Sequence, residues 1–125
     1  MNSNIHRNIA INKLNMGITK SDLFTDSQNE IATIAKVLGH PARIAILEHL
    51  LSIEACVCGD LVQEIGLAQP TISQHLKELK NLKIIKGTIS GTKSCYCIDK
   101  KEWQRITTIL HQFLTHKNTA TTCCN

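Results

Sequence analysis

The chain has 125 residues, enough for one domain with a single modest hydrophobic core and too few for two. Hydrophobic residues make up 42% of it and aromatic residues 3%, so the core must consist mainly of Ile, Leu, Val and Ala side chains. The net charge is +4, and five lysines against one glutamate give residues 69–93 the same net charge as the whole chain. Such a concentration of positive charge on a compact segment is expected of a phosphate-binding surface.

Six cysteines in so short a chain are also typical of secreted, disulfide-bonded domains. The N-terminal sequence MNSNIHRNIAINKLN argues against that class, because it has no apolar segment and no small-residue cleavage site. No apolar run approaches the ~20 residues of a membrane span. We therefore expect a cytoplasmic protein with no membrane partner, whose cysteines bind a metal or respond to redox conditions.

The two ends of the chain differ in composition from its middle. Residues 1–27 are polar, rich in Asn and without a sustained hydrophobic period, so we expect a flexible N-terminal arm. Met16 is an alternative to Met1 as the true start. Residues 117–125 are polar and carry two cysteines, which indicates a flexible, cysteine-bearing tail. The folded domain is therefore predicted to span residues 28–116.

Apolar residues at helical spacing predict a run of four helices in this domain. The first covers residues 28–38, and the second, residues 41–52, has apolar residues on more than one side, as a central buried helix does. A short third helix, residues 58–65, ends at Gly66, and a fourth covers residues 69–82 with a polar outer face. Two short helices separated by a tight turn form a helix-turn-helix.

The pattern then changes to that of a β-hairpin followed by one more helix. Residues 84–90 are rich in β-branched side chains, and residues 92–99 alternate again beyond Gly91, which marks the turn. The apolar stripe of residues 100–116 predicts a final helix. The element order is H-H-H-H-E-E-H, and the predicted fold class is mainly α (α+β), a winged helix-turn-helix.

The fourth helix has the composition of a helix that reads DNA. A recognition helix enters the major groove and contacts bases with residues near its N-terminus. Gln74 can form two hydrogen bonds with an adenine edge, and lysines on this helix and on the hairpin can hold phosphates. Charge alone would also suit an ordinary exposed helix, but the helix pattern, the hairpin and the charge agree. The residues predicted to contact DNA are Gln69, Thr71, Ser73, Gln74, His75, Lys77, Lys86 and Lys93.

Four blocks of the sequence resemble the arsenical-repressor (ArsR/SmtB) family of winged-helix metal sensors. The blocks are AKVLGHPARIAILEHL, CVCGDLV, LAQPTISQHLKELKNLKII and GTKSCYCID, in the family's order. Together they place the resemblance over about residues 28–115. It implies a homodimer joined through the first and last helices, double-stranded operator DNA with dyad symmetry as the partner, and derepression when a ligand binds.

The six cysteines occur as three close pairs. Soft thiolates select soft ions, and trivalent arsenic or antimony is satisfied by three thiolates in a pyramid. A single free cysteine more often fills a gap in a core, but three pairs beside a motif of metalloid sensors favour roles as ligands. The pairs are Cys56 with Cys58, Cys95 with Cys97, and Cys123 with Cys124.

We expect Cys56-Val57-Cys58 at the start of the third helix, where both sulfurs can turn inward and the helix dipole favours their thiolate form. The segment is similar to the family's Cys-Val-Cys-Asp-Leu box. However, Gly59 is inserted before the aspartate, and Val62 stands near the place of the box's third cysteine. The third thiolate must therefore come from elsewhere.

The other two pairs are the candidates for that third thiolate. Cys123 and Cys124 come first, because a mobile tail can fold back onto the site or reach the partner subunit. Cys95 and Cys97 come second; they share one face of a strand whose other face presents Tyr96 to the core. The expected inducer is arsenite or antimonite, with cadmium, lead or zinc as alternative ions.

Together these patterns predict a cytoplasmic DNA-binding repressor that leaves its operator when cysteine thiolates bind trivalent arsenic or antimony, with no resident cofactor. A thiol redox or persulfide sensor of the same fold is an alternative, and so is a cadmium-, lead- or zinc-sensing repressor. A thiol enzyme is disfavoured, because the chain has no C-x-x-C and no arrangement of nucleophile and base. No catalytic residue is predicted.

Overall fold

The structure, a computed structural model, describes residues 20–59, 61–88 and 95–117. By its contacts the chain divides into two units, Met1–Thr33 and Ile34–Asn125. The described part of the first unit consists of a short 3-10 helix, η1 (Lys20–Leu23), and the beginning of α2 (Asp26–Leu38). Lys93, Cys123, Cys124 and the predicted turn at Gly91 lie outside the described residues.

Helix α2 begins two residues before its predicted start, inside the segment expected to be a flexible arm. The reason is a capping box: the Gln28 backbone N–H donates to Thr25 Oγ1 at 3.1 Å, and the Thr25 N–H donates to Gln28 Oε1 at 2.9 Å. These two bonds satisfy backbone donors that a helix start otherwise leaves unpaired.

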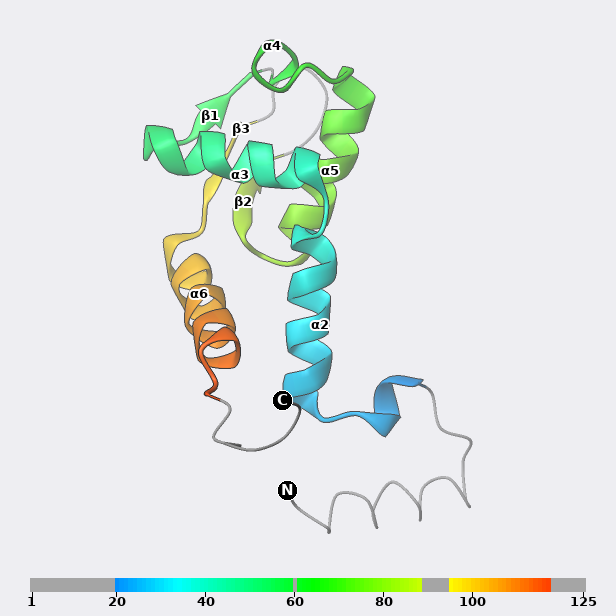
Figure 1. The fold of residues 1–125 in the computed structure, drawn as a ribbon. Helices are drawn as coiled ribbons and strands as arrows, with labels where there is room; N and C mark the ends of the chain where they lie inside the picture. The colour runs from blue at the N-terminus through cyan, green and yellow to red at the C-terminus, as the bar shows by residue number, and fades with distance from the viewer. Residues whose placement is uncertain (1–19, 60, 89–94, 118–125) are drawn as a thin grey trace, which may run out of the picture. The chain divides into compact units, whose positions relative to one another are not determined.

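The second unit has the architecture of a winged helix-turn-helix, as predicted. Short α4 and longer α5 form the helix-turn-helix, β2 and β3 form the wing, and α6 follows directly (Figure 1). The elements are α3 (Pro41–Ile53), β1 (Val57–Cys58), α4 (Val62–Ile65), α5 (Gln69–Asn81), β2 (Ile85–Thr88), β3 (Cys95–Ile98) and α6 (Lys100–Leu114).

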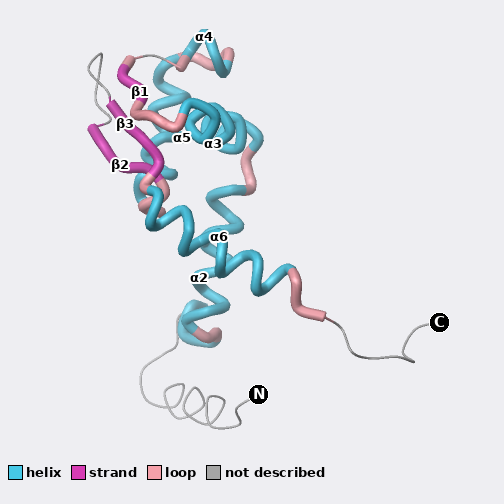
Figure 2. Tube along the Cα trace, turned by 90° about the vertical axis from the view of Figure 1, so that its left-hand side faces the viewer, coloured by secondary structure: helices cyan, strands magenta, loops and turns pink. Residues whose placement is uncertain are grey.

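The predicted hairpin is part of a three-stranded antiparallel sheet in the order β1-β3-β2 (Figure 2). Ile85 pairs with Ile98, and Gly87 pairs with Tyr96. Gly87 has a positive φ of 129°, and a Cβ there would collide with the carbonyl oxygen of Cys95, so only glycine fits this close approach of the two strands. On the other side of β3, Val57 pairs with Tyr96.

The expectation of a helix starting at Cys58 was wrong. Val57 and Cys58 form the strand β1, and the helix starts only at Val62. The physical reason is that β1 finds a backbone partner in β3, 37 residues further along the chain, while a β-branched valine between two cysteines suits a strand. The cysteines of this segment therefore do not lie at a helix N-terminus, and the helix dipole does not act on their thiols.

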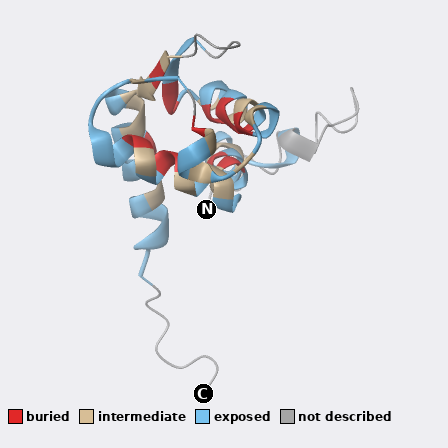
Figure 3. Cartoon of the chain, turned by 90° about the horizontal axis from the view of Figure 1, so that it is seen from above, coloured by how far each residue is buried: buried red, intermediate tan, exposed pale blue. Residues whose placement is uncertain are grey.

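The core of the second unit lies between the inner faces of the helices and the sheet. Buried positions, red in Figure 3, lie on the faces that these elements turn toward one another. Tyr96 contributes the largest buried side chain, and it points away from the cysteines on its strand, as predicted. The other core residues are Ile34, Val37, Ile46, Leu47, Leu50, Leu61, Ile72, Leu76, Leu79, Ile84, Ile85 and Ile106.

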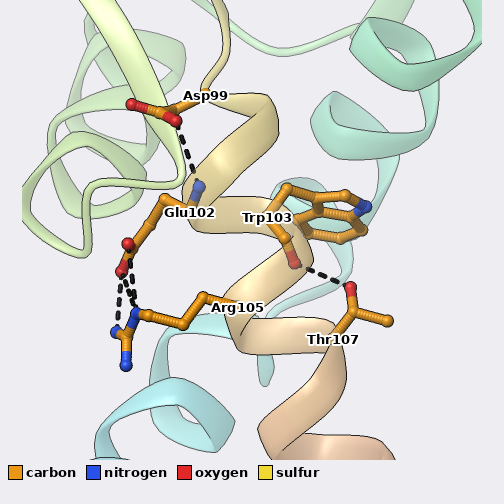
Figure 4. A network of polar contacts seen from close by, with 5 residues as sticks. All are labelled: Asp99, Glu102, Trp103, Arg105 and Thr107. Atoms are coloured by element: carbon orange, nitrogen blue, oxygen red, sulfur yellow. Dashed lines mark hydrogen bonds and ion pairs between the residues drawn. The ribbon is translucent and has the colours of Figure 1, made fainter.

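The start of α6 is fixed by its own side chains, directly after β3. Asp99 Oδ1 accepts a hydrogen bond from the Glu102 backbone N–H at 3.1 Å, and Arg105 pairs with the Glu102 carboxylate at 2.7 Å (Figure 4). Thr107 Oγ1 donates to the Trp103 carbonyl at 2.8 Å. Among the described residues, no helix is both long enough and apolar enough to cross a membrane.

Candidate functional site

The recognition helix α5 divides its residues between core and solvent. Ile72, Leu76 and Leu79 are at most 2% exposed and hold one face of the helix in the core. Gly66, in the left-handed conformation with a φ of 81°, ends α4 and donates its N–H to the Val62 carbonyl at 2.7 Å, which turns the chain toward α5. The second helix of the motif is thereby fixed on the first.

Most of the predicted DNA-contacting residues on α5 lie on its outer face. Thr71, Gln74 and Lys77 are exposed, and Ser73 is half-buried. The Gln74 side chain makes only a long hydrogen bond, 3.5 Å, to Glu78, so its amide remains able to bind a base edge. Gln69 is half-buried and donates to Ser73 Oγ at 3.2 Å, which suits a residue that shapes the helix start.

His75 occupies a different environment from the other predicted DNA contacts. It is 8% exposed, its Nδ1 accepts a hydrogen bond from Arg43 Nε at 3.2 Å, and its ring lies 4.3 Å from the ring of His40. Burial, followed by the nearby His40 and Arg43, lowers the pKa of His75 below its ordinary value of 6.5. A contact of His75 with DNA stays a prediction, whereas the structure gives this side chain a packing role between α3 and α5.

Arg43 is a residue of this region that the sequence reasoning missed. Besides His75, it donates from Nη1 to the Val37 carbonyl at 3.1 Å, so one guanidinium connects α2, α3 and α5. At the start of α3, His40 Nδ1 accepts from the Ala42 N–H at 3.1 Å and caps the helix. Nothing in the local pattern of apolar residues identifies such a bridge, because it depends on residues 32 apart.

Exposed lysines extend the polar face of α5 onto the wing. Lys86 is exposed on β2, as a phosphate contact requires. Lys80, near the end of α5, donates from Nζ to the Gly87 carbonyl on β2. This bond fixes the position of the wing relative to the recognition helix.

The pairing of β1 with β3 brings two of the three predicted cysteine pairs together. Cys58 lies directly opposite Cys95, with the Cα atoms 4.1 Å apart, and the two sulfurs form a disulfide. Cys56 and Cys97 are free thiols that are hydrogen-bonded to each other. Cys95 and Cys97 share one face of β3, since residues two apart in a strand share a face, and Cys56 directly precedes β1. We call these four residues the cysteine ladder.

The two free thiols of the ladder differ in their surroundings. Cys56 is exposed, whereas Cys97 is partly buried. The hydrogen bond with Cys56, and then burial, raise the pKa of the Cys97 thiol above its ordinary value. Because Cys56 is exposed and Cys97 is partly buried, an approaching soft ion reaches Cys56 first. Each thiol loses its proton when it becomes a metal ligand.

A cavity of about 760 Å³ adjoins the free thiols of the ladder. Cys56 and Cys97 both line it, Leu50 and Trp103 belong to its apolar wall, and Lys86 contributes a positive charge. The cavity gives a small solute access to this pair of thiols. Among the residues that the structure describes, no group of three or more His, Cys, Asp or Glu side chains is arranged to hold a metal ion.

These features define a winged helix-turn-helix regulator with a cysteine cluster between the wing and the strand that leads into the helix-turn-helix. Residues 40–86 match the model of the bacterial regulatory proteins of the arsR family. The chain is 34% identical over 92 residues to the arsenical resistance operon repressor of Staphylococcus xylosus, which is 74% of this chain and 77% of that protein. The chain therefore belongs to the arsR family of bacterial regulatory proteins.

Two further similarities agree with this assignment. The arsenical resistance operon repressor of Staphylococcus aureus is 36% identical over 70 residues, 56% of this chain and 66% of that protein. The crystal structure of the transcriptional repressor BigR from Xylella fastidiosa superposes with a TM-score of 0.50 at 29% identity, covering 74% of this chain and 92% of that one. The chain is thus a DNA-binding transcriptional repressor and not an enzyme.

Proposed function

We propose that this repressor leaves its operator when thiolates of the cysteine ladder bind trivalent arsenic or antimony. The observation that carries the proposal is the register of β1 against β3, which sets Cys58 opposite Cys95 next to the cavity that Cys56 and Cys97 line. The names of the two staphylococcal relatives, both repressors of arsenical resistance operons, support the choice of inducer. Three thiolates satisfy trivalent arsenic, and the reduced ladder offers four.

Cys56, Cys58 and Cys97 are the ligand set that this geometry supports best. Cys56 and Cys97 are free thiols that line the same cavity, and Cys58 lies two residues from Cys56 in the chain. The tail cysteines, Cys123 and Cys124, stay a prediction from the sequence. Replacing them tests whether the ladder suffices without them.

The route from the ladder to the DNA-binding surface is short. Strand β1 leads into α4, and α4 packs against α3 and turns into α5. Drawing Cys56 and Cys58 toward Cys97 shifts the strand that precedes the helix-turn-helix, and with it α4. Because a repressor of this kind must fit both half-sites of an operator, a small shift lowers its affinity strongly.

The remaining parts of the proposal concern the partners. We infer a homodimer on a double-stranded operator in the cytoplasm, with Thr71, Gln74 and Lys77 of α5 in the major groove and Lys86 on the backbone. Phe113 and Leu114 near the end of α6 are 56% and 74% exposed, and a partner subunit would bury them. Operator and inducer oppose each other by linkage, so bound DNA weakens arsenite binding by the same factor as arsenite weakens DNA binding.

Operator binding by the reduced protein, titrated with arsenite, tests this function. The C56S/C58S variant is the test protein and C123S/C124S the matched control, each with two serines. We expect arsenite to release wild type and the control at about one arsenic per chain and to leave C56S/C58S bound. Release of C56S/C58S by arsenite would overturn the ligand assignment, and retention of wild type would overturn the inducer. Parallel titrations with cadmium, lead and zinc identify an alternative ion.

A thiol redox sensor is the second candidate, because the structure contains the Cys58–Cys95 disulfide. Cytosolic disulfides are commonly transient and sense redox conditions. In that function oxidation alone releases the repressor from DNA, without any metalloid. The same binding assay with peroxide or polysulfide in place of arsenite separates the two candidates.

A further inference from the structure

The cysteine ladder is half oxidised and half reduced. Its Cys58–Cys95 pair forms a disulfide, while the neighbouring Cys56–Cys97 pair remains as two thiols. Cys58 and Cys95 face each other across β1 and β3, whereas Cys56 directly precedes β1 and lines the same cavity as Cys97. The site proposed for the inducer therefore shares one residue, Cys58, with a disulfide whose other residue, Cys95, is not needed for capture.

We propose that oxidation of Cys58 and Cys95 makes the repressor insensitive to arsenite without releasing it from DNA. This rests on the proposed function, since it concerns regulation of the same site. Each As–OH bond of arsenous acid is replaced by an As–S bond, with one thiol proton leaving in the water that forms, so capture needs three thiols and leaves arsenic trivalent. A disulfide sulfur has no such proton to lose.

The oxidised ladder falls short of that requirement by one thiol. With Cys58 bound to Cys95, the described residues retain only Cys56 and Cys97. With only two thiolates, the third ligand of arsenic is a hydroxide or water oxygen instead of a sulfur. The affinity for arsenite is then lower than with three thiolates held close together.

The redox step itself needs a two-electron oxidant, and a hydroperoxide is the class we assign. The Cys58 and Cys95 thiols lose two protons and two electrons and form one S–S bond, while the O–O bond breaks to give an alcohol and water (two waters from hydrogen peroxide). A thiol reductant reverses the step by exchange, restoring both thiols and becoming a disulfide. The strand register brings the two sulfurs within bonding reach, so no refolding is required.

The disulfide leaves the described part of the predicted DNA-binding surface intact. In the structure that contains it, α4 and α5 are formed, and Gln74 and Lys77 stand exposed. The bond joins β1 to β3 and involves no residue of α5. Oxidation therefore ties the strand that leads into the helix-turn-helix to β3 and leaves α5 formed, so we expect DNA affinity to be kept, unlike in a redox sensor that releases DNA when oxidised.

The test uses the full chain carrying C123S/C124S, so that only ladder cysteines remain. One sample is reduced with a phosphine, which unlike a dithiol does not capture arsenic well, and another is oxidised with hydrogen peroxide; both reagents are removed. Equilibrium dialysis measures bound arsenic, and fluorescence anisotropy measures operator binding. The matched variant adds C95S, which cannot form the disulfide but keeps Cys56, Cys58 and Cys97.

We expect the reduced protein to bind about one arsenic per chain and to lose operator affinity at least about tenfold with arsenite. The oxidised protein should bind the operator equally well and take up at least about tenfold less arsenic at the same arsenite concentration. The reduced C95S variant should take up as much arsenic as the reduced parent, because Cys56, Cys58 and Cys97 remain. Peptide mapping should find the Cys58–Cys95 bond only in the oxidised parent.

Equal arsenic uptake by the reduced and oxidised parent would overturn the proposal, as would a lower uptake by reduced C95S than by the reduced parent, or release of DNA by peroxide alone. Redox-dependent uptake without DNA release would uphold the redox control of arsenic capture but overturn the proposed function, in which capture releases the operator. No uptake by the reduced parent would overturn both, because the ladder would then not capture arsenite in any state.

Discussion

The recognition helix and the cysteine ladder are neighbours in one small domain, but different forces hold them. Helix α5 is kept in place by Ile72, Leu76 and Leu79, three buried side chains from thirteen consecutive residues. The ladder joins residues 37 apart in sequence through backbone pairing and one covalent bond. Apolar burial does not respond to oxidants or soft ions, whereas a pair of thiols does. The support of the helix predicted to read DNA is therefore chemically inert, and the site proposed to sense the inducer is chemically labile.

The largest effect we predict concerns the apolar support of α5. Leu79→Ala removes a side chain that is 0% exposed, and the cavity left behind should lower the free energy of unfolding by about 3–5 kcal/mol. Urea denaturation at one fixed protein concentration measures this value, since a dimer's stability depends on concentration. Ile53→Ala, at a position 39% exposed, is the control and should cost under about 1 kcal/mol. Similar costs at the two positions would contradict the buried support of α5.

The next effect concerns the covalent support of the ladder. The Cys58–Cys95 bond closes a loop with a sequence separation of 37, and reducing it should lower the free energy of unfolding by about 2–4 kcal/mol. Urea denaturation with and without phosphine measures the difference. The C56S/C97S variant retains the disulfide and should lose as much on reduction, whereas C58S/C95S should show no dependence on reductant. A dependence that persists in C58S/C95S would place the stabilising bond elsewhere.

The same contrast explains what the sequence could and could not predict. Helix α5 repeats its apolar residues at the helical period and has a proline at its start, so its limits and its buried face follow from local pattern. The strand β1 is only two residues long, too short for alternation to show, and it exists because β3 pairs with it. For the same reason the Cys56-Val57-Cys58 segment was assigned to a helix, and the disulfide could not be foreseen.

Side chains that connect elements were equally hard to foresee. The sequence suggested that His75 faces DNA, because it falls among polar residues near the start of α5. In the structure His75 is buried against Arg43 and His40, which lie at the start of α3. Only the packing of α3 on α5 decides this, whereas the exposure of Gln74 and Lys77 follows from the helical period alone.

A third prediction tests the DNA-reading face directly. Gln74→Ala removes an amide able to make two hydrogen bonds with adenine, and specific operator binding should weaken by about 1–3 kcal/mol per half-site. Lys77→Ala is the comparison: it should weaken binding to all sequences alike and flatten the dependence of affinity on salt. Anisotropy titrations with operator and scrambled DNA at several salt concentrations separate the two effects. Neither variant should alter arsenic uptake, and a change in uptake would contradict the independence of the two regions.

The smallest effect we predict is a pH dependence carried by His75. Its pKa is lowered, mainly by burial and then by His40 and Arg43, with Glu78 acting in the opposite direction. The folded chain thus binds fewer protons at this site than the unfolded chain, so stability is full above the ordinary value of 6.5 and falls as the pH drops below it. Protonated Nδ1 can no longer accept from Arg43, which weakens the junction of α3 and α5.

Comparing the free energy of unfolding at about pH 7.5 and about pH 5.5 measures this contribution. Wild type should lose more stability on acidification than His75→Gln, whose amide keeps a hydrogen-bonding oxygen for Arg43 but does not titrate. His40 is present in both proteins, so the difference between them isolates His75. The reduced and oxidised forms should show the same difference, because the histidine cluster lies on the helices and the ladder on the sheet. Equal losses in the two proteins would show that His75 is not held neutral by its burial.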